Sequence, residues 1–143
     1  TCALPICDEA EAQADYDRQL DIEAFDIDEN MVNIAIENAK HAGLGKDITF
    51  KQLAAKDWTT DKVNGVLVSN PPYGERLGEL EAARELYTEM GDVYRQLPSW
   101  SKYILTSDLD FETSFGEKAT KRRKLYNGAM RVDYFQYWGK RAK

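Results

Sequence analysis

Two periodicities of hydrophobic and polar positions run along the chain, and together they predict alternating strands and helices. Apolar residues spaced by three or four over 80–97, before Pro98, predict the clearest helix. A second helix should begin after Asp28, which caps it, and stop at Gly43. A short helix is expected over 111–115. Short apolar runs predict strands over 21–27, 48–53, 65–69, 102–106 and 131–138.

The strand expected over 65–69 contains three consecutive apolar residues, Val66 to Val68, which predicts burial on both faces. Strands separated by helices favour an α/β fold with a mostly parallel sheet covered on both sides. In such folds ligands bind beyond the carboxyl ends of the strands. Two polar segments, Asp26 to Asp28 and the loop that begins at Asn70, fall at such ends.

The composition indicates one folded domain, because 43% of the 143 residues are hydrophobic and 11% are aromatic. No apolar run reaches the ~18 residues of a membrane span, and the N-terminus does not resemble a signal peptide. We therefore expect a soluble, cytoplasmic protein without a membrane partner. Cys2, Cys7 and His41 are too few for a disulfide framework or a zinc site, so no metal is expected.

The net charge of −6 hides a division along the chain. Residues 1–115 contain 10 Lys and Arg against 23 Asp and Glu, a balance of −13. Residues 116–143 contain 9 against 2, a balance of +7. The C-terminal end is therefore the segment whose charge suits a phosphate backbone.

The sharpest chemical signal is Ser-Asn-Pro-Pro-Tyr-Gly at residues 69–74, directly after an expected strand. Two prolines fix their φ angles and offer no N–H, which makes the loop stiff and leaves carbonyls free to accept. The Asn70 side-chain oxygen and the Pro71 carbonyl can together hold an exocyclic NH2 group with its lone pair toward an electrophile. Tyr73 offers a face for base stacking. The alternative is a proline-rich turn with a surface tyrosine.

Asn-Pro-Pro-Tyr after a strand resembles the reaction loop of amino-methyltransferases, which include adenine-N6 DNA and guanine-N2 RNA enzymes. The run Ser-Asn-Pro-Pro-Tyr-Gly-Glu-Arg-Leu-Gly at 69–78 is similar to bacterial 23S ribosomal RNA guanine-N2 methyltransferases, often labelled N6-adenine-specific DNA methylases. The likeness extends from about Asp15 to the C-terminus. It implies a Rossmann-like class I methyltransferase sheet and S-adenosylmethionine (SAM) as cofactor. The catalytic residues that it implies are Asn70, Pro71, Pro72 and Tyr73.

The resemblance also implies cofactor-binding positions. Asp26 matches the acidic residue that binds the ribose hydroxyls of SAM, and Ile27 and Asn70 are assigned to the cofactor with it. The alternative role for Asp26, capping the next helix, better describes Asp28. Relatives often place an acidic residue after the next strand, where this sequence has Ala54. Asp57 either substitutes from one turn further along or is a solvated loop residue.

The front of the chain departs from the family pattern. Related enzymes carry a glycine-rich loop, typically Asp-Pro-x-Cys-Gly-Ser-Gly, after their first strand. The earliest glycine here is Gly43. We therefore expect residues 8–143 to form the C-terminal portion of a single methyltransferase domain that lacks the first strand and this loop. Residues 1–7 match nothing in the family, as foreign sequence at a truncation would.

The basic cluster at 118–124, followed by Tyr126, is either a phosphate-contacting edge or a solvated loop. Arg76 either contacts substrate phosphate or pairs with Glu75 or Glu79. The candidate substrate-binding residues are Tyr73, Arg76, Lys121, Arg122 and Arg123.

The resulting hypothesis is SAM-dependent methylation of guanine N2 in 23S ribosomal RNA, on a base flipped out of its stack. Two alternatives remain: adenine-N6 methylation of DNA, and a catalytically inactive fragment that is at most an RNA-binding remnant. An α/β nucleotide-binding protein of unrelated chemistry is disfavoured, because no phosphate-binding glycine loop is present.

Overall fold

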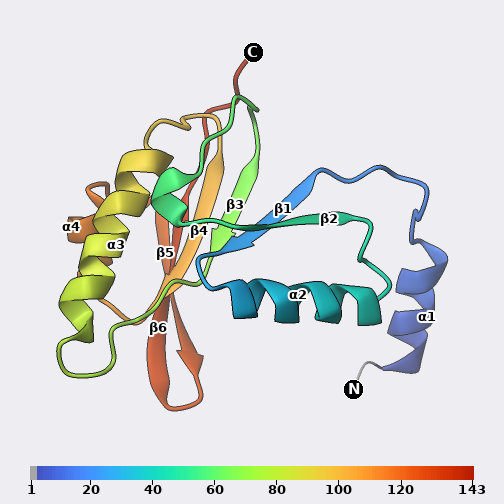
Figure 1. Ribbon diagram of the computed structural model, residues 1–143, viewed down its shortest axis with the longest axis horizontal. Helices are drawn as coiled ribbons and strands as arrows, with labels where there is room; N and C mark the ends of the chain where they lie inside the picture. Colours follow the sequence, from blue (N-terminus) through green and yellow to red (C-terminus); the bar gives the residue numbers. More distant parts are fainter. Residues whose placement is uncertain (1–2) are drawn as a thin grey trace. The chain divides into compact units, whose positions relative to one another are not determined.

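A computed structural model describes residues 3–143 and divides the chain into two compact units (Figure 1). The first unit ends at Gln52 and the second spans Leu53–Lys143. Each unit is described by itself. Within the described residues, no helix combines the length and the apolar character that crossing a bilayer would require.

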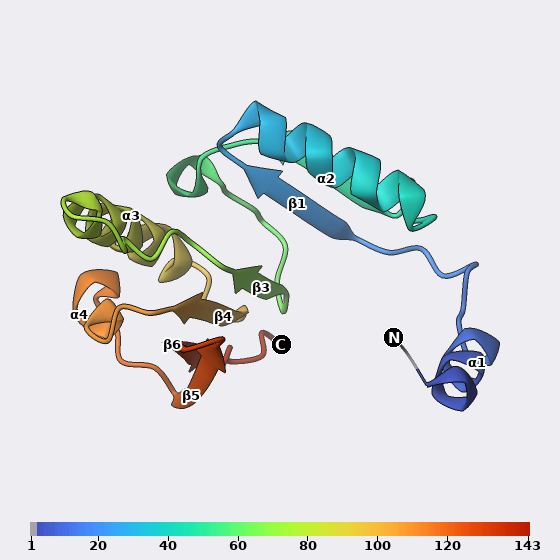
Figure 2. The same cartoon turned by 90° about the horizontal axis from the view of Figure 1, so that it is seen from below.

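The first unit is built around a strand–helix–strand motif, in which two parallel strands are joined by a helix. The strands pair from Ile22 opposite Ile48 to Asp26 opposite Gln52. The connecting helix lies along the strand pair (Figure 2), and it buries Val32. An additional helix, not predicted from the sequence, buries no residue. The elements are α1 (Leu4–Ala12), β1 (Ile22–Asp26), α2 (Glu29–His41) and β2 (Ile48–Gln52).

Both predicted boundaries of α2 are confirmed. The side chain of Asp28 accepts a hydrogen bond from the Asn30 backbone N–H at 2.8 Å, which satisfies one of the unpaired donors of the first turn. At the other end Gly43 has a φ of 75°, and the N–H of Leu44 reaches back to the carbonyl of Ala39. This is the left-handed cap that glycine favours.

The second unit contains a four-stranded sheet with strand order β3-β4-β6-β5. Only β3 and β4 are parallel, whereas β6 runs antiparallel to both of its neighbours. The expectation of a mostly parallel sheet is therefore wrong for this unit. The reason is a hairpin at Gly128, whose φ of 62° suits the tight turn between β5 and β6. The elements are η1 (Ala55–Asp57), β3 (Val66–Ser69), α3 (Glu79–Tyr94), β4 (Ser101–Thr106), α4 (Phe111–Phe115), β5 (Lys121–Asn127) and β6 (Met130–Tyr137).

Helices α3 and α4 cover one face of this sheet, where aromatic rings form the core (Figures 1 and 2). The ring of Phe111 lies 4.9 Å from Tyr87 and 4.8 Å from Phe135, and Phe115 lies 4.7 Å from Tyr137. Such ring pairs contribute ~0.5–1.5 kcal/mol each beyond their buried area. This core joins α3 and α4 to the strands that follow the loop at Asn70.

The prediction that β3 is buried on both faces is wrong. Leu67 is 7% exposed, but Val66 and Val68 are 64% and 75% exposed. The helices of the second unit pack on the Leu67 side alone, so the alternation of side chains along the strand leaves both valines uncovered. Sequence alone did not distinguish this arrangement from a strand buried on both sides.

Candidate functional site

The predicted reaction loop, Asn70 to Tyr73, opens the segment that connects the end of β3 to the start of α3. Gly74 has a φ of 72°, and a Cβ there would lie 2.6 Å from the Cα of Leu80. Only glycine combines that conformation with so close an approach. The loop is therefore held against the first turn of α3, after two prolines that already restrict its first residues.

Asn70 lies at the surface, where its side chain is accessible to a substrate. Its Oδ1 atom accepts a hydrogen bond from the Tyr73 hydroxyl at 2.7 Å. Burial, and then the negative charge of Glu75, raises the pKa of Tyr73. The hydroxyl therefore stays protonated at neutral pH and can keep donating to Asn70. In this conformation the predicted acceptor is present but already engaged by the predicted stacking residue.

The two proline carbonyls of the loop differ in their surroundings. Among the described residues, no hydrogen bond reaches the carbonyl of Pro71, although the residue itself is buried. The carbonyl of Pro72 accepts from the hydroxyl of Tyr87 at 2.5 Å. The Pro71 carbonyl is therefore an acceptor without a partner among the described residues, whereas the Asn70 oxygen becomes one only when Tyr73 releases it.

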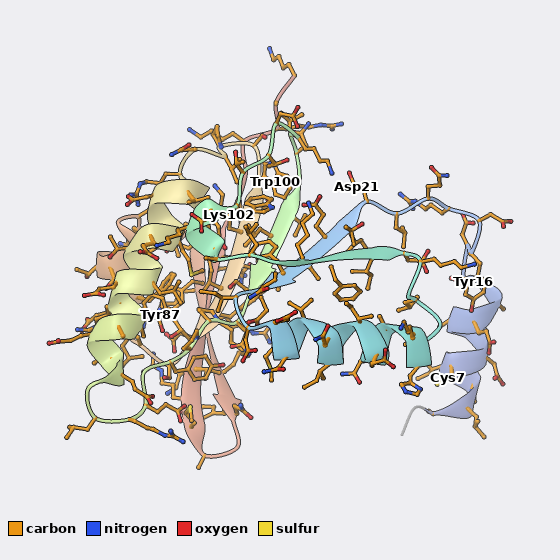
Figure 3. The ribbon with its side chains drawn as sticks, in the orientation of Figure 1. Cys7, Tyr16, Asp21, Tyr87, Trp100 and Lys102 are labelled. Atoms are coloured by element: carbon orange, nitrogen blue, oxygen red, sulfur yellow. The ribbon has the colours of Figure 1, made fainter. Side chains whose placement is uncertain are left out.

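Behind the loop, Tyr87 belongs to a buried polar network that the sequence analysis did not identify. Tyr87 projects from the middle of α3 (Figure 3) and is completely buried. Its hydroxyl lies 2.9 Å from Oγ1 of Thr106, at the end of β4. Thr106 in turn accepts from the backbone N–H of Asp108 at 3.2 Å. The only sequence signal was the polar Thr-Ser-Asp run after an apolar strand.

Arg84 fixes the far end of this network. Its Nε and Nη2 atoms bind the two carboxylate oxygens of Asp108 at 2.8 and 2.9 Å. The Asp108 side chain is 4% exposed, so the pairing takes place away from most of the solvent. The hydrogen bond from Arg84 is the largest influence on the pKa of Asp108 and lowers it. Asp108 is therefore a carboxylate at neutral pH.

The first unit places Asp26 and Ile27 at the carboxyl end of β1. Asp26 is exposed, and its Oδ1 accepts from the backbone N–H of Asp28 at 2.8 Å. Its Oδ2 has no hydrogen bond within the described part of the chain. Ile27 is 70% exposed, and its carbonyl accepts from the side chain of Gln52 at 3.1 Å. A carboxylate oxygen of Asp26 without a hydrogen-bond partner among the described residues and the exposed side chain of Ile27 therefore lie at the same strand end.

Asp57 ends η1 in the second unit and is exposed. It lines an open depression of about 250 Å³ together with Lys56, Trp58 and residues near the end of α3. Its neighbour Lys56 lies 3.8 Å from Glu89 of α3. This geometry suits a solvated residue as well as a ligand-binding one, so the cofactor role of Asp57 stays a prediction.

The basic segment, predicted to be either a phosphate-contacting edge or a solvated loop, forms β5, the edge strand of the second sheet. Arg122 contacts the buried carboxylate of Asp133, approaches Glu112 at 3.6 Å and lies 4.7 Å above the ring of Phe135. Burial works to raise the pKa of Asp133, but hydrogen bonds from Arg131 and Arg122 outweigh it, so the pKa is lowered. Arg122 is thus engaged in internal ion pairs.

The other candidate cations remain exposed. Strand alternation places Lys121 and Arg123 on the side opposite Arg122. Arg76 follows the reaction loop, and its side chain is 86% exposed, 3.9 Å from Glu79. An ion pair of that length at the surface restrains a side chain little. Lys121, Arg123 and Arg76 therefore remain accessible to an anionic partner.

Comparison with known protein families identifies the family of this chain. The family model described as UPF0020, an RMKL-like methyltransferase domain, matches residues 3–136. The chain belongs to this family. The candidate RNA methyltransferase YpsC of Bacillus subtilis is 55% identical over 132 residues, which are 92% of this chain and 34% of that protein. The ribosomal RNA large subunit methyltransferase K/L of Shewanella frigidimarina is 36% identical over 136 residues, 92% of this chain and 19% of that protein.

Solved structures of family members confirm the Rossmann-like class I methyltransferase fold. SMU.472, a candidate methyltransferase solved in complex with SAH, superposes with a TM-score of 0.90 at 52% identity. The match covers 98% of this chain and 37% of SMU.472. A predicted N6-adenine-specific DNA methylase from Listeria monocytogenes superposes with a TM-score of 0.85 at 51% identity, over 96% of this chain and 35% of that one. This chain therefore spans about a third of the length of YpsC, SMU.472 and the Listeria protein, and about a fifth of the Shewanella enzyme.

Proposed function

We propose that the protein containing this chain transfers a methyl group from SAM to N2 of a guanine in large-subunit (23S) ribosomal RNA. The observation that carries the proposal is the exposed Asn70 residue, followed by two prolines at the carboxyl end of β3. Support for an RNA substrate comes from the relatives named as RNA methyltransferases. Support for the cofactor comes from the SAH-bound relative.

The residues at the end of β1 suit the ribose of SAM. The free Oδ2 of Asp26 can accept from a ribose hydroxyl, while the bond from the Asp28 N–H keeps the carboxylate oriented. The exposed Ile27 offers an apolar contact beside it. When bound, the cofactor supplies a methyl group on a positively charged sulfur, which an amine nitrogen can attack.

The reaction loop orients that amine. Asn70 Oδ1 and the Pro71 carbonyl each accept one hydrogen of the NH2 group, which directs the nitrogen lone pair away from the loop. The same two oxygens offset the positive charge that develops on nitrogen during transfer. Tyr73 releases Asn70 when the base arrives, and its ring is then available to stack on that base. The extra proton of the methylated amine leaves to solvent.

The exposed cations suit the RNA backbone. Lys121 and Arg123 share one side of β5. Contacts from such residues to phosphate strengthen binding in a salt-dependent way without reading sequence. Lysine on an edge strand also protects the sheet against pairing with other chains, and this role does not require RNA. Binding measurements with variants of Lys121 and Arg123 separate these two roles.

Methylation of extracted ribosomal RNA by the complete protein tests the proposal. We expect N2-methylguanosine in the digested 23S RNA, with label transferred from methyl-labelled SAM. Label in N6-methyladenine of DNA would favour the alternative that the Listeria relative's name suggests. Absence of transfer to either substrate by a protein that binds SAM would refute both. Calorimetry of residues 1–143 alone against SAM tests whether this fragment keeps any cofactor affinity.

A further inference from the structure

We propose that Tyr87 is a positioning residue for the reaction, because its hydroxyl holds the Pro72 carbonyl turned into the protein. The proposal rests on the proposed function of the reaction loop. Tyr87 is 0% exposed and lies fifteen positions after Pro72, on the helix that packs behind the loop. Because it is buried behind the loop, Tyr87 acts through the loop backbone and not by contact with the substrate or the cofactor.

The hydrogen-bonding capacity of each group fixes the direction of the network. A proline carbonyl can only accept, so the single O–H of Tyr87 must donate to Pro72. The Thr106 hydroxyl must then donate to the Tyr87 oxygen, 2.9 Å away. Thr106 Oγ1 is left to accept from the Asp108 N–H. Every donor and acceptor along the series is satisfied in one direction, which ends at the Pro72 carbonyl.

The residues at the other end of this network are held in place by hydrogen bonds and burial. Asp108 is held by Arg84 through two hydrogen bonds, and Arg84 lies on α3 one turn before Tyr87. Thr106 is completely buried at the end of β4, the strand paired with β3. The carbonyl of Pro72 is therefore tied to the helix after the loop and to the neighbouring strand.

The consequence for the reaction concerns the peptide between Pro72 and Tyr73. Holding the Pro72 oxygen inward sets the plane of this peptide, from which Tyr73 projects. It also keeps this carbonyl from competing with Asn70 and Pro71 for the hydrogens of the amine. Burial is the main cause of the raised pKa of Tyr87, so the hydroxyl keeps its proton through neutral pH.

Packing is the competing explanation, since the Tyr87 ring also lies 4.9 Å from Phe111. Tyr87→Phe separates the two roles, because it keeps the ring and removes the hydroxyl. The matched control is Tyr94→Phe, the same change at a tyrosine 1% exposed and two turns along α3. Thr106→Ser keeps a hydroxyl, and Thr106→Val removes it at similar volume.

The experiment uses the complete protein and measures two quantities for each variant. Hydrogen exchange followed by mass spectrometry reports the mobility of residues 73–78, and steady-state kinetics reports kcat and the KM for SAM. For Tyr87→Phe we expect faster exchange in this segment and a kcat roughly 10- to 100-fold lower, because small misplacements of reacting groups cost that much. The KM for SAM should stay unchanged. Tyr94→Phe and Thr106→Ser should match wild type in both measurements.

Unchanged exchange in Tyr87→Phe, or a kcat equal to that of Tyr94→Phe, would overturn the proposal. If Tyr87→Phe fails to fold, Thr106→Val provides the test, with faster exchange and a lower kcat expected and wild-type values contradicting the proposal. Failure of the proposed function is recognised separately, as absence of methyl transfer by wild type. The exchange comparison then still decides whether the Tyr87 hydroxyl anchors the loop.

Discussion

Replacing Tyr73 by phenylalanine separates the two roles of this residue. The hydroxyl donates to Asn70 Oδ1 at 2.7 Å, and a substrate amine must displace it to use that acceptor. A hydrogen bond of this kind contributes ~0.5–1.5 kcal/mol net. The substrate therefore binds against a cost of about 1 kcal/mol, equivalent to roughly fivefold in affinity. Tyr73→Phe removes the cost and keeps the aromatic face.

We expect Tyr73→Phe to lower the KM for RNA by up to about fivefold, with kcat close to wild type. Tyr73→Ala should raise this KM instead, because losing base stacking costs ~1–3 kcal/mol. Steady-state kinetics on 23S RNA fragments at fixed salt and saturating SAM measures both variants. An equal rise in the KM for RNA in both variants would refute the reasoning, because the contribution of Tyr73 would then come from its hydroxyl and not from its ring.

Three further predictions follow from the second unit. Gly74→Ala should destabilise the protein by at least ~1–2 kcal/mol in urea unfolding, because it adds a Cβ at positive φ against the backbone of α3. Gly78→Ala, also at positive φ but with no atom within 4 Å of the new Cβ, should cost less. Replacing both Lys121 and Arg123 by glutamine should lower the slope of log K against log salt concentration for RNA binding by about 1.4, because two phosphate contacts at ~0.7 each are lost. Asp108 has a pKa lowered by its arginine partner, so its contribution to stability is present at neutral pH and is lost as the pH falls below about 4. Urea unfolding at a series of pH values should show that the free energy of unfolding of wild type falls in acid. The fall should be smaller in Asp108→Asn.

Controls define how each of these predictions would fail. Lys46→Glu changes an exposed cation outside β5, so its salt slope should equal that of wild type. An equal reduction in that control would assign the effect to net charge alone. Equal destabilisation of Gly74→Ala and Gly78→Ala would show that close approach to α3 is unimportant. If the free energy of unfolding fell equally with pH in wild type and Asp108→Asn, Asp108 would not contribute to the loss of stability in acid.

The sequence predicted those elements whose signal is local. The helix α3 has its own apolar periodicity, the strand β3 has a run of consecutive apolar residues, and the ends of α2 are set by Asp28 and Gly43 at its termini. The exposed position of Asn70 likewise follows from a strand that ends at two prolines. These predictions needed no knowledge of distant contacts.

The features that the sequence did not predict depend on distant contacts. The sequence of β5 is too basic to show the apolar pattern of a strand, and it forms a strand because β6 pairs with it along its whole length. Gly128 was the one local sign of that hairpin. The exposed faces of Val66 and Val68 depend on where helices pack. The link from Tyr87 to Pro72 joins residues whose types suggest only a core tyrosine and a turn.

The most direct test of the central claim is the turnover of Asn70→Ala in the complete protein, measured beside its affinity for SAM. Asn70 is exposed, so folding should stay near wild type, and because Asp26 and Ile27 remain to hold the cofactor, the affinity for SAM should change little. Removing one of the two acceptors for the amine should lower kcat by roughly 10²- to 10³-fold, as loss of one positioned polar group at a reacting centre does. Wild-type turnover in Asn70→Ala would contradict the account, because the amine would then be oriented by other groups.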